Sequence, residues 1–297
     1  MSASVTVIMR SKNAAWVIGQ ALAGLFSQRL KDFELLVVDS GSTDATLDIV
    51  RRFPCRLIQI EATEYFPGAV LNRAIQQARG ELLVFQNSDV VPLTPQALEQ
   101  LLEPLEAGEA DATFARQLPR PEAHTWVRRD YAVAFPSHGE PPSWMAYSLP
   151  FAAMRRTAWE RHPFYEDAWG SEDTEWGHWA RNNGLGVRYV PQSLVMHSHN
   201  YTLRQLYGRR FIEGEADAFI FRDRMSLGRL ARGLGSAWMH DAEAHLAARD
   251  ALGLLLSIPR RFVYHWAYLQ GHRLGERRRA TGNQDASIGQ QVVLERW

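Results

Sequence analysis

The 297-residue sequence contains a single cysteine and only two lysines among its 33 basic residues. One cysteine, Cys55, excludes an intrachain disulfide framework, which is typical of a protein from a reducing compartment. Because Cys55 lies in the largely apolar run 55–58, we interpret it as a packing residue rather than a nucleophile. The formal net charge is zero, so composition gives no support for a nucleic-acid partner.

Long hydrophobic runs are also missing. The longest apolar stretch in the C-terminal part covers residues 251–256, far fewer than the ~20 residues that a membrane span needs. A strand-like run begins almost at the first residue, so no signal peptide is visible. We therefore expect a cytoplasmic protein, either free or attached to the inner face of the cell membrane without crossing it.

Glycine-rich phosphate loops are a further absence. The first apolar run is followed by Arg10-Ser11-Lys12-Asn13, without the G-x-G-x-x-G pattern of dinucleotide-binding proteins. The P-loop pattern G-x-x-x-x-G-K-[ST] does not occur in the sequence. These absences argue against a nicotinamide-dependent dehydrogenase and against a P-loop enzyme.

The first half of the sequence alternates strand and helix patterns. Near-continuous apolar strands separated by helices are typical of an α/β fold with a mostly parallel sheet that helices cover on both faces. The expected strands are 5–9, 34–39, 56–60 and 81–85, and the expected helices are 14–28, 68–78 and one that Ser42 or Thr43 caps and that runs to about 52. Ligands bind such sheets at the carboxyl ends of the strands.

The second half is less regular. Residues 118–150 lack periodicity, and we interpret them as an irregular functional segment. A helix over 171–182, two short strands at 187–190 and 193–197, and helices beyond 202 are expected after them. We place a domain boundary at 225 and predict a helical extension over 226–297.

Within this extension, Phe262, Trp266 and Leu269 recur at spacings of four and three, with arginines nearby. They form either a surface helix packed on the core or an amphipathic face on anionic lipid.

Polar residues follow two of the buried strands. Asp39, with Ser40 and Gly41 after it, can accept hydrogen bonds from a base or a ribose, although such residues also form ordinary turns. Asp89 ends the segment that follows the strand at 81–85, and its carboxylate is an oxygen ligand suited to Mg²⁺ or Mn²⁺. A turn aspartate is the alternative for Asp89.

Two later clusters carry titratable groups. Glu172, Asp173 and Glu175 crowd the start of the helix at 171–182, where acids either cap the helix dipole or accept a proton. Trp169 and Trp176 flank them, as a sugar-stacking wall or as core. His197 and His199 lie two apart on a strand and share a face, where neutral imidazoles are competent metal ligands.

Five features follow one another in the sequence: the loops at 10–13, 39–44 and 86–89, the acids at 172–175, and the histidines at 197 and 199. In this order they resemble family 2 glycosyltransferases with the GT-A fold, over roughly residues 4–225. The matching segments are 5–13, 37–44, 72–74 with Gly80-Glu81, 87–89 and Glu172-Asp173. Within the family, the sequence is most similar to bacterial rhamnosyltransferase-type members. Phe66-Pro67-Gly68, Asn72-Arg73 and the segment 197–206 carry that closer similarity.

The resemblance implies inverting transfer of a sugar, rhamnose among the candidates, from a dTDP-, UDP- or GDP-linked donor to a hydroxyl of a glycan or lipid-linked acceptor. It implies Asp173 as catalytic base with Glu172 beside it. We expect Asp89 to hold Mn²⁺ or Mg²⁺ with the help of one of His197 and His199, and we favour His197 because it lies nearer the strand end. The implied nucleotide contacts are Arg10, Ser11, Asn13, Asp39, Ser40, Gly41, Asn72, Asn87 and Ser88. It leaves the oligomeric state open.

One position departs from the family pattern. Asn87 stands where the first acid of the family's D-x-D motif is expected, so it brings a carbonyl oxygen but no charge. Metal affinity is then expected to be lower, with Asp89 carrying more of the coordination. Asn87 is also the basis for an alternative, a non-catalytic nucleotide- or carbohydrate-binding protein on a degenerate glycosyltransferase fold.

Overall fold

The computed structural model describes residues 4–167 and 169–282, and the chain divides into two compact units. The first unit contains the residues up to 120 together with 131–165 and 172–198. The second contains 121–130, 166–171 and the residues from 199 onward. This division groups residues 199–225 with the later helices, whereas the sequence-based boundary at 225 counts them with the catalytic domain.

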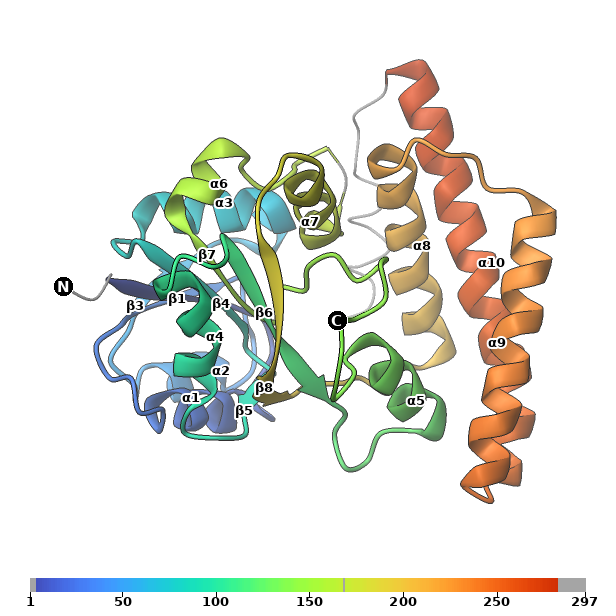
Figure 1. The fold of residues 1–297 in the computed structure, drawn as a ribbon, viewed down its shortest axis with the longest axis horizontal. Helices are drawn as coiled ribbons and strands as arrows, with labels where there is room; N and C mark the ends of the chain where they lie inside the picture. Colours follow the sequence, from blue (N-terminus) through green and yellow to red (C-terminus); the bar gives the residue numbers. More distant parts are fainter. Residues whose placement is uncertain (1–3, 168, 283–297) are drawn as a thin grey trace. The chain divides into compact units, whose positions relative to one another are not determined.

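The first unit is built on an eight-stranded sheet with the order β3-β2-β1-β4-β7-β6-β8-β5 (Figure 1). Its strands are β1 (Val5–Ser11), β2 (Glu34–Asp39), β3 (Arg56–Gln59), β4 (Leu82–Asn87), β5 (Val91–Pro92), β6 (Ala112–Leu118), β7 (Phe151–Arg155) and β8 (Val187–Met196). The pairs among β1, β2, β3 and β4 are parallel, as is β6 with β8, while β7 is antiparallel to both its neighbours. The mostly parallel α/β sheet predicted from the sequence is confirmed.

Two segments differ from the sequence-based expectation. The two short strands expected at 187–190 and 193–197 form one strand, β8, whose pairing with β6 shifts register between Ala115 and Arg116. The segment expected to be irregular contains a helix, α5 (Thr125–Ala134), with Val127 and Ala134 buried. Prolines on both sides of α5 obscure its short periodic pattern.

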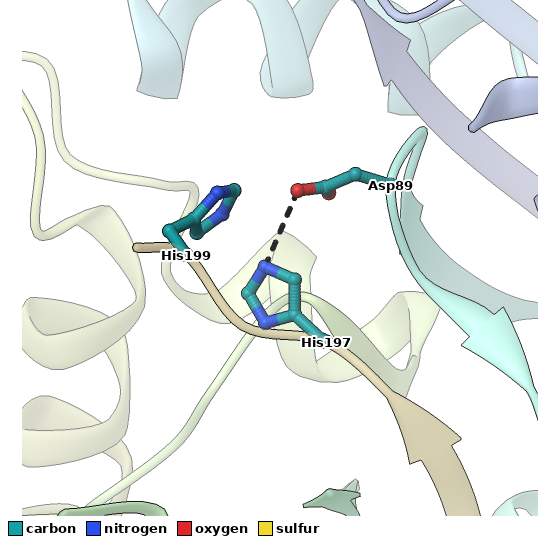
Figure 2. Close-up of side chains that lie close together, drawn as sticks. All are labelled: Asp89, His197 and His199. Atoms are coloured by element: carbon teal, nitrogen blue, oxygen red, sulfur yellow. Dashed lines mark ion pairs between the residues drawn. The ribbon is translucent and has the colours of Figure 1, made fainter. Parts of the chain in front are cut away.

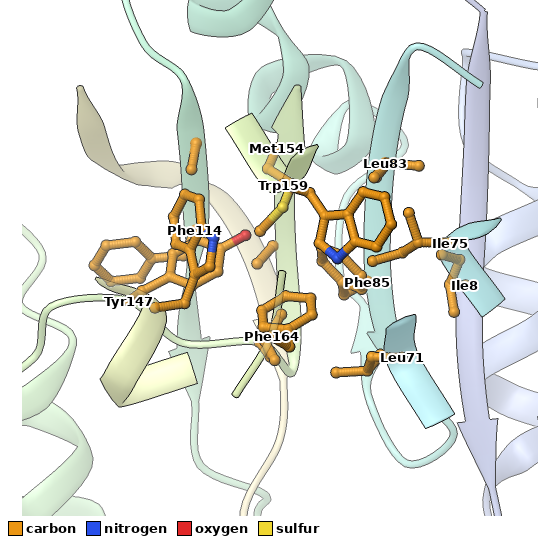
Figure 3. Packing of buried hydrophobic residues seen from close by; sticks show 14 of the residues in the cluster. Ile8, Leu71, Ile75, Leu83, Phe85, Phe114, Tyr147, Met154, Trp159 and Phe164 are labelled. Atoms are coloured by element: carbon orange, nitrogen blue, oxygen red, sulfur yellow. The ribbon is translucent and has the colours of Figure 1, made fainter. Parts of the chain in front are cut away.

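Helices cover both faces of the sheet. Along β1, Val7 and Met9 belong to one buried cluster and Ile8 to the other, as the alternation of a strand requires. The helices α3 (Pro67–Gln77), α6 (Arg156–Arg161) and α7 (Glu172–Asn182) pack on the Ile8 side, part of which Figure 3 shows. The helices α1 (Ile18–Phe26), α2 (Thr46–Val50) and α4 (Ala97–Glu106) pack on the other side.

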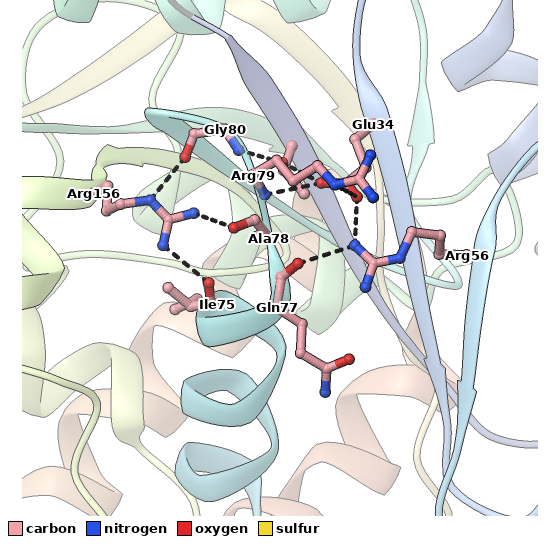
Figure 4. Close-up of polar contacts among 9 residues, drawn as sticks. Glu34, Arg56, Ile75, Gln77, Ala78, Arg79, Gly80 and Arg156 are labelled. Carbon is pink, nitrogen blue, oxygen red and sulfur yellow. Dashed lines mark hydrogen bonds and ion pairs between the residues drawn. The ribbon is translucent and has the colours of Figure 1, made fainter.

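Arg156 holds the end of α3 against the sheet (Figure 4). Its guanidinium donates hydrogen bonds to the carbonyl oxygens of Ile75, Ala78 and Gly80, at 3.0, 2.7 and 2.9 Å. Carbonyls in the last turn of a helix have no partner within the helix, so a cation there satisfies them and also suits the helix dipole. Gly80 is needed at this turn, because a Cβ would lie 2.4 Å from the backbone nitrogen of Thr6.

Glu34 joins the starts of two strands at the same end of the sheet. Its carboxylate accepts hydrogen bonds from the Thr6 hydroxyl at 2.9 Å and from the Arg79 backbone at 3.0 Å, and it pairs with Arg56 at 2.6 Å (Figure 4). Because β1, β2 and β4 are parallel, their carboxyl ends lie together at the opposite edge of the sheet.

The second unit is helical. It consists mainly of α8 (Leu203–Ile220), α9 (Leu227–Ala247) and α10 (Ala251–Thr281), the last two running antiparallel (Figure 1). Buried ion pairs cross it, including Arg261 with Asp241 at 2.7 Å and Arg278 with Glu215 at 2.5 Å. Within the described ranges, no helix combines the length and apolar character that crossing a membrane requires.

Candidate functional site

The loops that follow β1 and β2 are tied to each other by side chains. Asn13, in a left-handed conformation with φ 46°, donates its backbone N–H to Ser42 Oγ at 2.8 Å. Its side-chain oxygen accepts from the backbone N–H of Thr43 at 2.8 Å. The expectation that Ser42 or Thr43 caps a helix is wrong, since α2 begins after Ala45 without a side-chain cap.

Asp39 is fully buried at the end of β2 and shapes the turn after it. Its two carboxylate oxygens accept from the backbone N–H and the hydroxyl of Ser42, at 2.8 and 2.6 Å. Each oxygen retains capacity for a second donor. Ser40 donates its N–H to the Ser11 carbonyl at 3.0 Å, and the buried Ser11 hydroxyl has no hydrogen-bond partner among the described residues. Gly41 completes the turn with φ 77°.

Arg10 places a cation where β1, β4 and α7 converge. Its guanidinium pairs with Glu172 at 2.6 Å and makes a long contact of 3.5 Å with the Asn87 side-chain oxygen. Both charged side chains are largely buried, with 15% of Arg10 and 8% of Glu172 exposed. Burial lowers the pKa of Arg10, but the neighbouring Tyr65 and Glu172 outweigh it and hold that pKa above the ordinary value. Arg10 is therefore a permanent positive charge at this edge.

Asp89 and His197 face each other at the same edge (Figure 2). The carboxylate of Asp89 lies 3.6 Å from His197 Nε2, and the preceding Ser88 donates its N–H to the Arg10 carbonyl at 3.3 Å. His197 is buried, and its Nδ1 lies 2.7 Å from the side-chain oxygen of Gln117. Nδ1 therefore donates to Gln117, and Nε2 is the ring nitrogen that faces Asp89.

His199 completes a group of three metal-ligating side chains. One ligand atom from each of Asp89, His197 and His199 lies within 4.8 Å of the others (Figure 2). Around an ion with bonds of about 2.1 Å, adjacent ligands lie about 3.0 Å apart and opposite ones about 4.2 Å apart. The 3.6 Å between Asp89 and His197 falls within this range, so these two side chains fit as ligands of one small divalent ion.

Arg120 is a residue of this region that sequence reasoning missed. Its Nη2 donates to the backbone carbonyl of Asp89 at 2.5 Å, and its own backbone N–H donates to Ser198 Oγ at 2.9 Å. The guanidinium carbon lies 4.9 Å from the centre of the Trp16 ring. Arg120 thus fixes the loop that carries Asp89, but it sits in a proline-rich segment whose pattern gave no signal for it.

The three acids at the start of α7 have three different partners. Glu172 pairs with Arg10, whereas Glu175 contacts His162 Nε2 at 3.0 Å. Asp173 accepts the backbone N–H of Leu149 at 3.3 Å through one oxygen and that of Thr174 through the other. Only Glu172 and Asp173 therefore remain as candidates for chemistry at this edge.

The packing of α7 explains how those two acids are positioned. Gly177 lets the helix approach the chain at 146–147, since a Cβ there would lie 2.6 Å from the Tyr147 Cβ. Trp176 is fully buried and donates to the His162 carbonyl at 2.9 Å. Trp169 is 7% exposed. Trp176 belongs to the buried core cluster, so the core alternative is correct for this residue, and the role of Trp169 stays a prediction.

The structure does not bring Asn72 to these loops. Its amide nitrogen donates to the Phe164 carbonyl at 2.8 Å, and its amide oxygen accepts from Trp159 Nε1 at 2.9 Å. These partners lie on the Ile8 side of the sheet, where Asn72 joins α3 to α6 and to the chain after it. Asn72 therefore drops out of the expected nucleotide contacts, while the other expected residues line the ends of β1, β2, β4 and β8.

The chain was compared with known families, sequences and structures. The model of glycosyl transferase family 2 matches residues 6–169. The O-antigen chain rhamnosyltransferase WbaN of Salmonella anatum is 28% identical over 197 residues, which cover 61% of each chain. The homologous RfbN of Salmonella typhimurium LT2 is 25% identical over 223 residues, or 71% of each. The aligned region thus spans about three fifths of the length of WbaN.

Solved structures share the fold. A mannosyltransferase from Pyrobaculum calidifontis, in complex with GDP-Man and Mn²⁺, has a TM-score of 0.59 at 22% identity and covers 98% of this chain and 87% of its own. Glucosyl-3-phosphoglycerate synthase from Mycobacterium tuberculosis has a TM-score of 0.55 at 20% identity, over 73% and 80%. The predicted GT-A architecture and the similarity to rhamnosyltransferase-type members are both confirmed, and the chain belongs to glycosyl transferase family 2.

Proposed function

We propose that this protein transfers a sugar, rhamnose in the first instance, from a nucleotide diphosphate to a hydroxyl of a glycan or lipid-linked acceptor, with inversion at the anomeric carbon. The proposal rests on the position of the Asp89 carboxylate, which lies 3.6 Å from His197 Nε2 at the sheet edge that also carries the Arg10 cation. Gln117 holds the His197 ring in place through Nδ1. The choice of rhamnose follows the printed names of the two Salmonella relatives.

The nucleotide is proposed to lie across the joined loops of β1 and β2. Asp39 accepts from base or ribose, and the Ser11 hydroxyl supplies a buried donor without a partner among the described residues. Ser40, Gly41 and Asn13 contribute backbone and amide groups along the same edge. Arg10, with Asn87 and Ser88 beside it, meets the diphosphate as charge develops on the leaving group.

A divalent ion is proposed as cofactor, held by Asp89, His197 and His199. When bound, it supplies positive charge that stabilises the departing nucleotide diphosphate. Two imidazoles beside one carboxylate favour Mn²⁺ over Mg²⁺, because Mg²⁺ prefers oxygen ligands. Asn87, at the position of the family's first acid, adds no charge, and the Arg10 guanidinium places a fixed cation 3.5 Å from its side-chain oxygen.

Asp173 is proposed to take the proton from the acceptor hydroxyl. Attack on the face opposite the leaving group inverts the configuration and requires one positioned proton acceptor. Glu172 is already paired with Arg10, so its proposed role is to hold that cation in place. A lipid-linked acceptor would bring the protein, otherwise cytoplasmic, to the inner face of the membrane.

Release of nucleoside diphosphate tests this proposal. The purified chain is incubated with dTDP-rhamnose, GDP-mannose or UDP-glucose, each with Mn²⁺, Mg²⁺ or excess chelator, and water replaces the acceptor hydroxyl, so that hydrolysis of the donor is measured. We expect turnover of one donor with Mn²⁺ and its loss on chelation and in the Asp89→Asn variant, while the exposed Asp48→Asn control behaves like wild type. Tight donor binding with no turnover under any condition would instead favour the non-catalytic alternative.

A further inference from the structure

The turn between α9 and α10 exposes an unusual number of large apolar side chains. The apolar tip, as we name it, consists of residues whose exposed fractions range from 44% to 69%: Leu246, Leu252, Leu255, Leu256, Ile258 and Phe262. It lies at one end of the α9–α10 pair (Figure 1). Contiguous exposed apolar residues of this kind mark an interaction surface rather than ordinary surface variation.

The start of α10 has its polar and apolar faces exchanged. The buried residues there are Gly253, Ser257 and Arg261, four apart, whereas Leu255 and Leu256 between them are exposed. Arg261 is held inside by Asp241 and by Asp130, at 2.7 and 2.9 Å. A helix in water buries its apolar face, so the exchange indicates that a non-aqueous phase meets the leucines.

Few charged side chains accompany the apolar tip. Within residues 246–262, all of which the structure describes, Arg249 is exposed and Arg261 is buried. The Asp250 side chain is 36% exposed, but its carboxylate accepts the Gly253 N–H at 2.8 Å and contacts His245 and Thr125. The surface is therefore mainly apolar, with one exposed arginine beside an acid that is engaged within the unit.

We propose that the apolar tip inserts into the interfacial layer of an anionic lipid bilayer. Leucine, isoleucine and phenylalanine with a flanking arginine match the requirements of a surface that enters about 5–10 Å into lipid. A protein partner is less well matched, because binding energy at protein interfaces concentrates in tryptophan, tyrosine and arginine, and leucine is under-represented there. This inference deepens the proposed function, since it supplies the contact by which a lipid-linked acceptor is reached.

The surface differs from the one that periodicity suggested. Of the residues expected to face lipid, Leu269 is fully buried, Trp266 is half-buried and Arg261 is ion-paired inside the unit. Arg260 stacks over Trp126 at 3.9 Å. The packed-helix alternative is therefore correct for this stretch, and only Phe262 is shared with the apolar tip.

Sedimentation with vesicles tests the proposal on the full chain, without donor or acceptor. Vesicles of equal phosphatidylcholine and phosphatidylglycerol should bind the wild type, and vesicles of phosphatidylcholine alone should bind it more weakly. Leu252→Glu with Leu255→Glu should reduce the partition coefficient by about tenfold or more. Leu227→Glu is the matched control, because Leu227 is also exposed but lies at the other end of α9, about 28 Å from Leu246 at 1.5 Å per residue.

Thermal unfolding and light scattering accompany the binding assay. The double variant should melt like the wild type, since its changes are on exposed positions. Asp89→Asn leaves the apolar tip unchanged and should bind vesicles like the wild type. Vesicle binding therefore tests the membrane proposal separately from the proposed transferase activity. Equal vesicle binding by wild type and the double variant, or no binding by wild type, would overturn the inference. A dimer that the double variant dissociates, without vesicle binding, would reassign the tip to self-association.

Discussion

The side-chain oxygen of Gln117 lies 2.7 Å from Nδ1 of His197 and thereby orients the ring toward Asp89. Gln117 donates its own N–H to Ser148 Oγ at 2.9 Å, so its oxygen is left to accept. The proton of His197 is consequently placed on Nδ1, away from Asp89. Gln117 on β6 thus orients His197, which follows β8, toward Asp89, which follows β4.

Gln117→Leu should weaken metal binding while leaving the metal ligands in place. Loss of an outer-shell partner of a ligating histidine lowers metal affinity by about 10–100-fold. The Mn²⁺ concentration for half-maximal turnover should rise accordingly, and saturating Mn²⁺ should restore most of kcat. Ser148→Ala serves as a milder control. A variant with the wild-type Mn²⁺ dependence would show that His197 does not need this partner.

Asp173→Asn tests the proposed base. The change keeps the shape and removes the proton acceptor, so kcat should fall by roughly 10²–10⁴ with little change in donor affinity. Glu175→Gln is the matched control from the same turn of α7, because Glu175 contacts His162 instead. Near-normal turnover in Asp173→Asn would remove Asp173 from the role.

Arg10 and Glu172 should behave as a coupled pair. Removing either partner leaves a largely buried charge uncompensated, which destabilises a protein by about 3–5 kcal/mol. Arg10→Gln should also weaken nucleoside diphosphate binding, whereas Glu172→Gln should affect stability more than kcat. Chemical denaturation of the two single variants and the double variant measures the coupling. Strict additivity, or a kcat loss in Glu172→Gln as large as in Asp173→Asn, contradicts our assignment.

The strands and the polar residues at their ends could be predicted from the sequence because both signals are local. Apolar runs such as 34–39 and 81–85 have few alternatives to buried strands, and the chain order of Asp39, Asp89 and Glu172-Asp173 carries the family pattern. The metal group was expected because Asp89 follows a strand and because His197 and His199 lie two apart on an expected strand. β8 ends at Met196, so both histidines lie just beyond it.

What could not be predicted depends on contacts between distant segments. Gln117 and Arg120 orient groups up to 80 positions away, and no spacing in the sequence reveals this. The family pattern suggested ligand contact for Asn72, and the aromatic ring of Trp176 suggested sugar stacking, but tertiary packing uses both side chains inside the core. The apolar tip was missed because leucines in a helix are ordinarily assigned to its buried face.

Asp217 should make the helical unit sensitive to pH. Burial, outweighing the Tyr268 hydrogen bond and Arg210, raises the pKa of Asp217 from 3.8 to about 6. The folded state therefore binds the proton more tightly, so the stabilisation is complete below the unfolded pKa and is lost as pH rises through about 6. Asp217→Asn should gain stability relative to wild type by about 2 kcal/mol on going from about pH 4.5 to pH 7.5.

The comparison with wild type is needed because another group titrates in the opposite sense. Burial, with Arg210 and Arg261 nearby, lowers the pKa of His265 to about 4, so its contribution is lost as pH falls from about 6.5. The contribution of His265 to the free energy of unfolding is the same in the wild type and in Asp217→Asn. It therefore cancels when the two unfolding free energies are subtracted. A difference in unfolding free energy that does not change with pH would contradict the assignment to Asp217.

Electron paramagnetic resonance of Mn²⁺ shows directly whether Asp89 holds a divalent ion together with a bound nucleotide. The signal of free Mn²⁺ is followed as protein is added, with and without dTDP, for the wild type, Asp89→Asn, His197→Ala and the Asp48→Asn control. The account predicts that the wild type and the control remove free Mn²⁺, more strongly with dTDP, and that the other two variants remove little. Wild-type Mn²⁺ binding by Asp89→Asn, or full turnover in excess chelator, would contradict it.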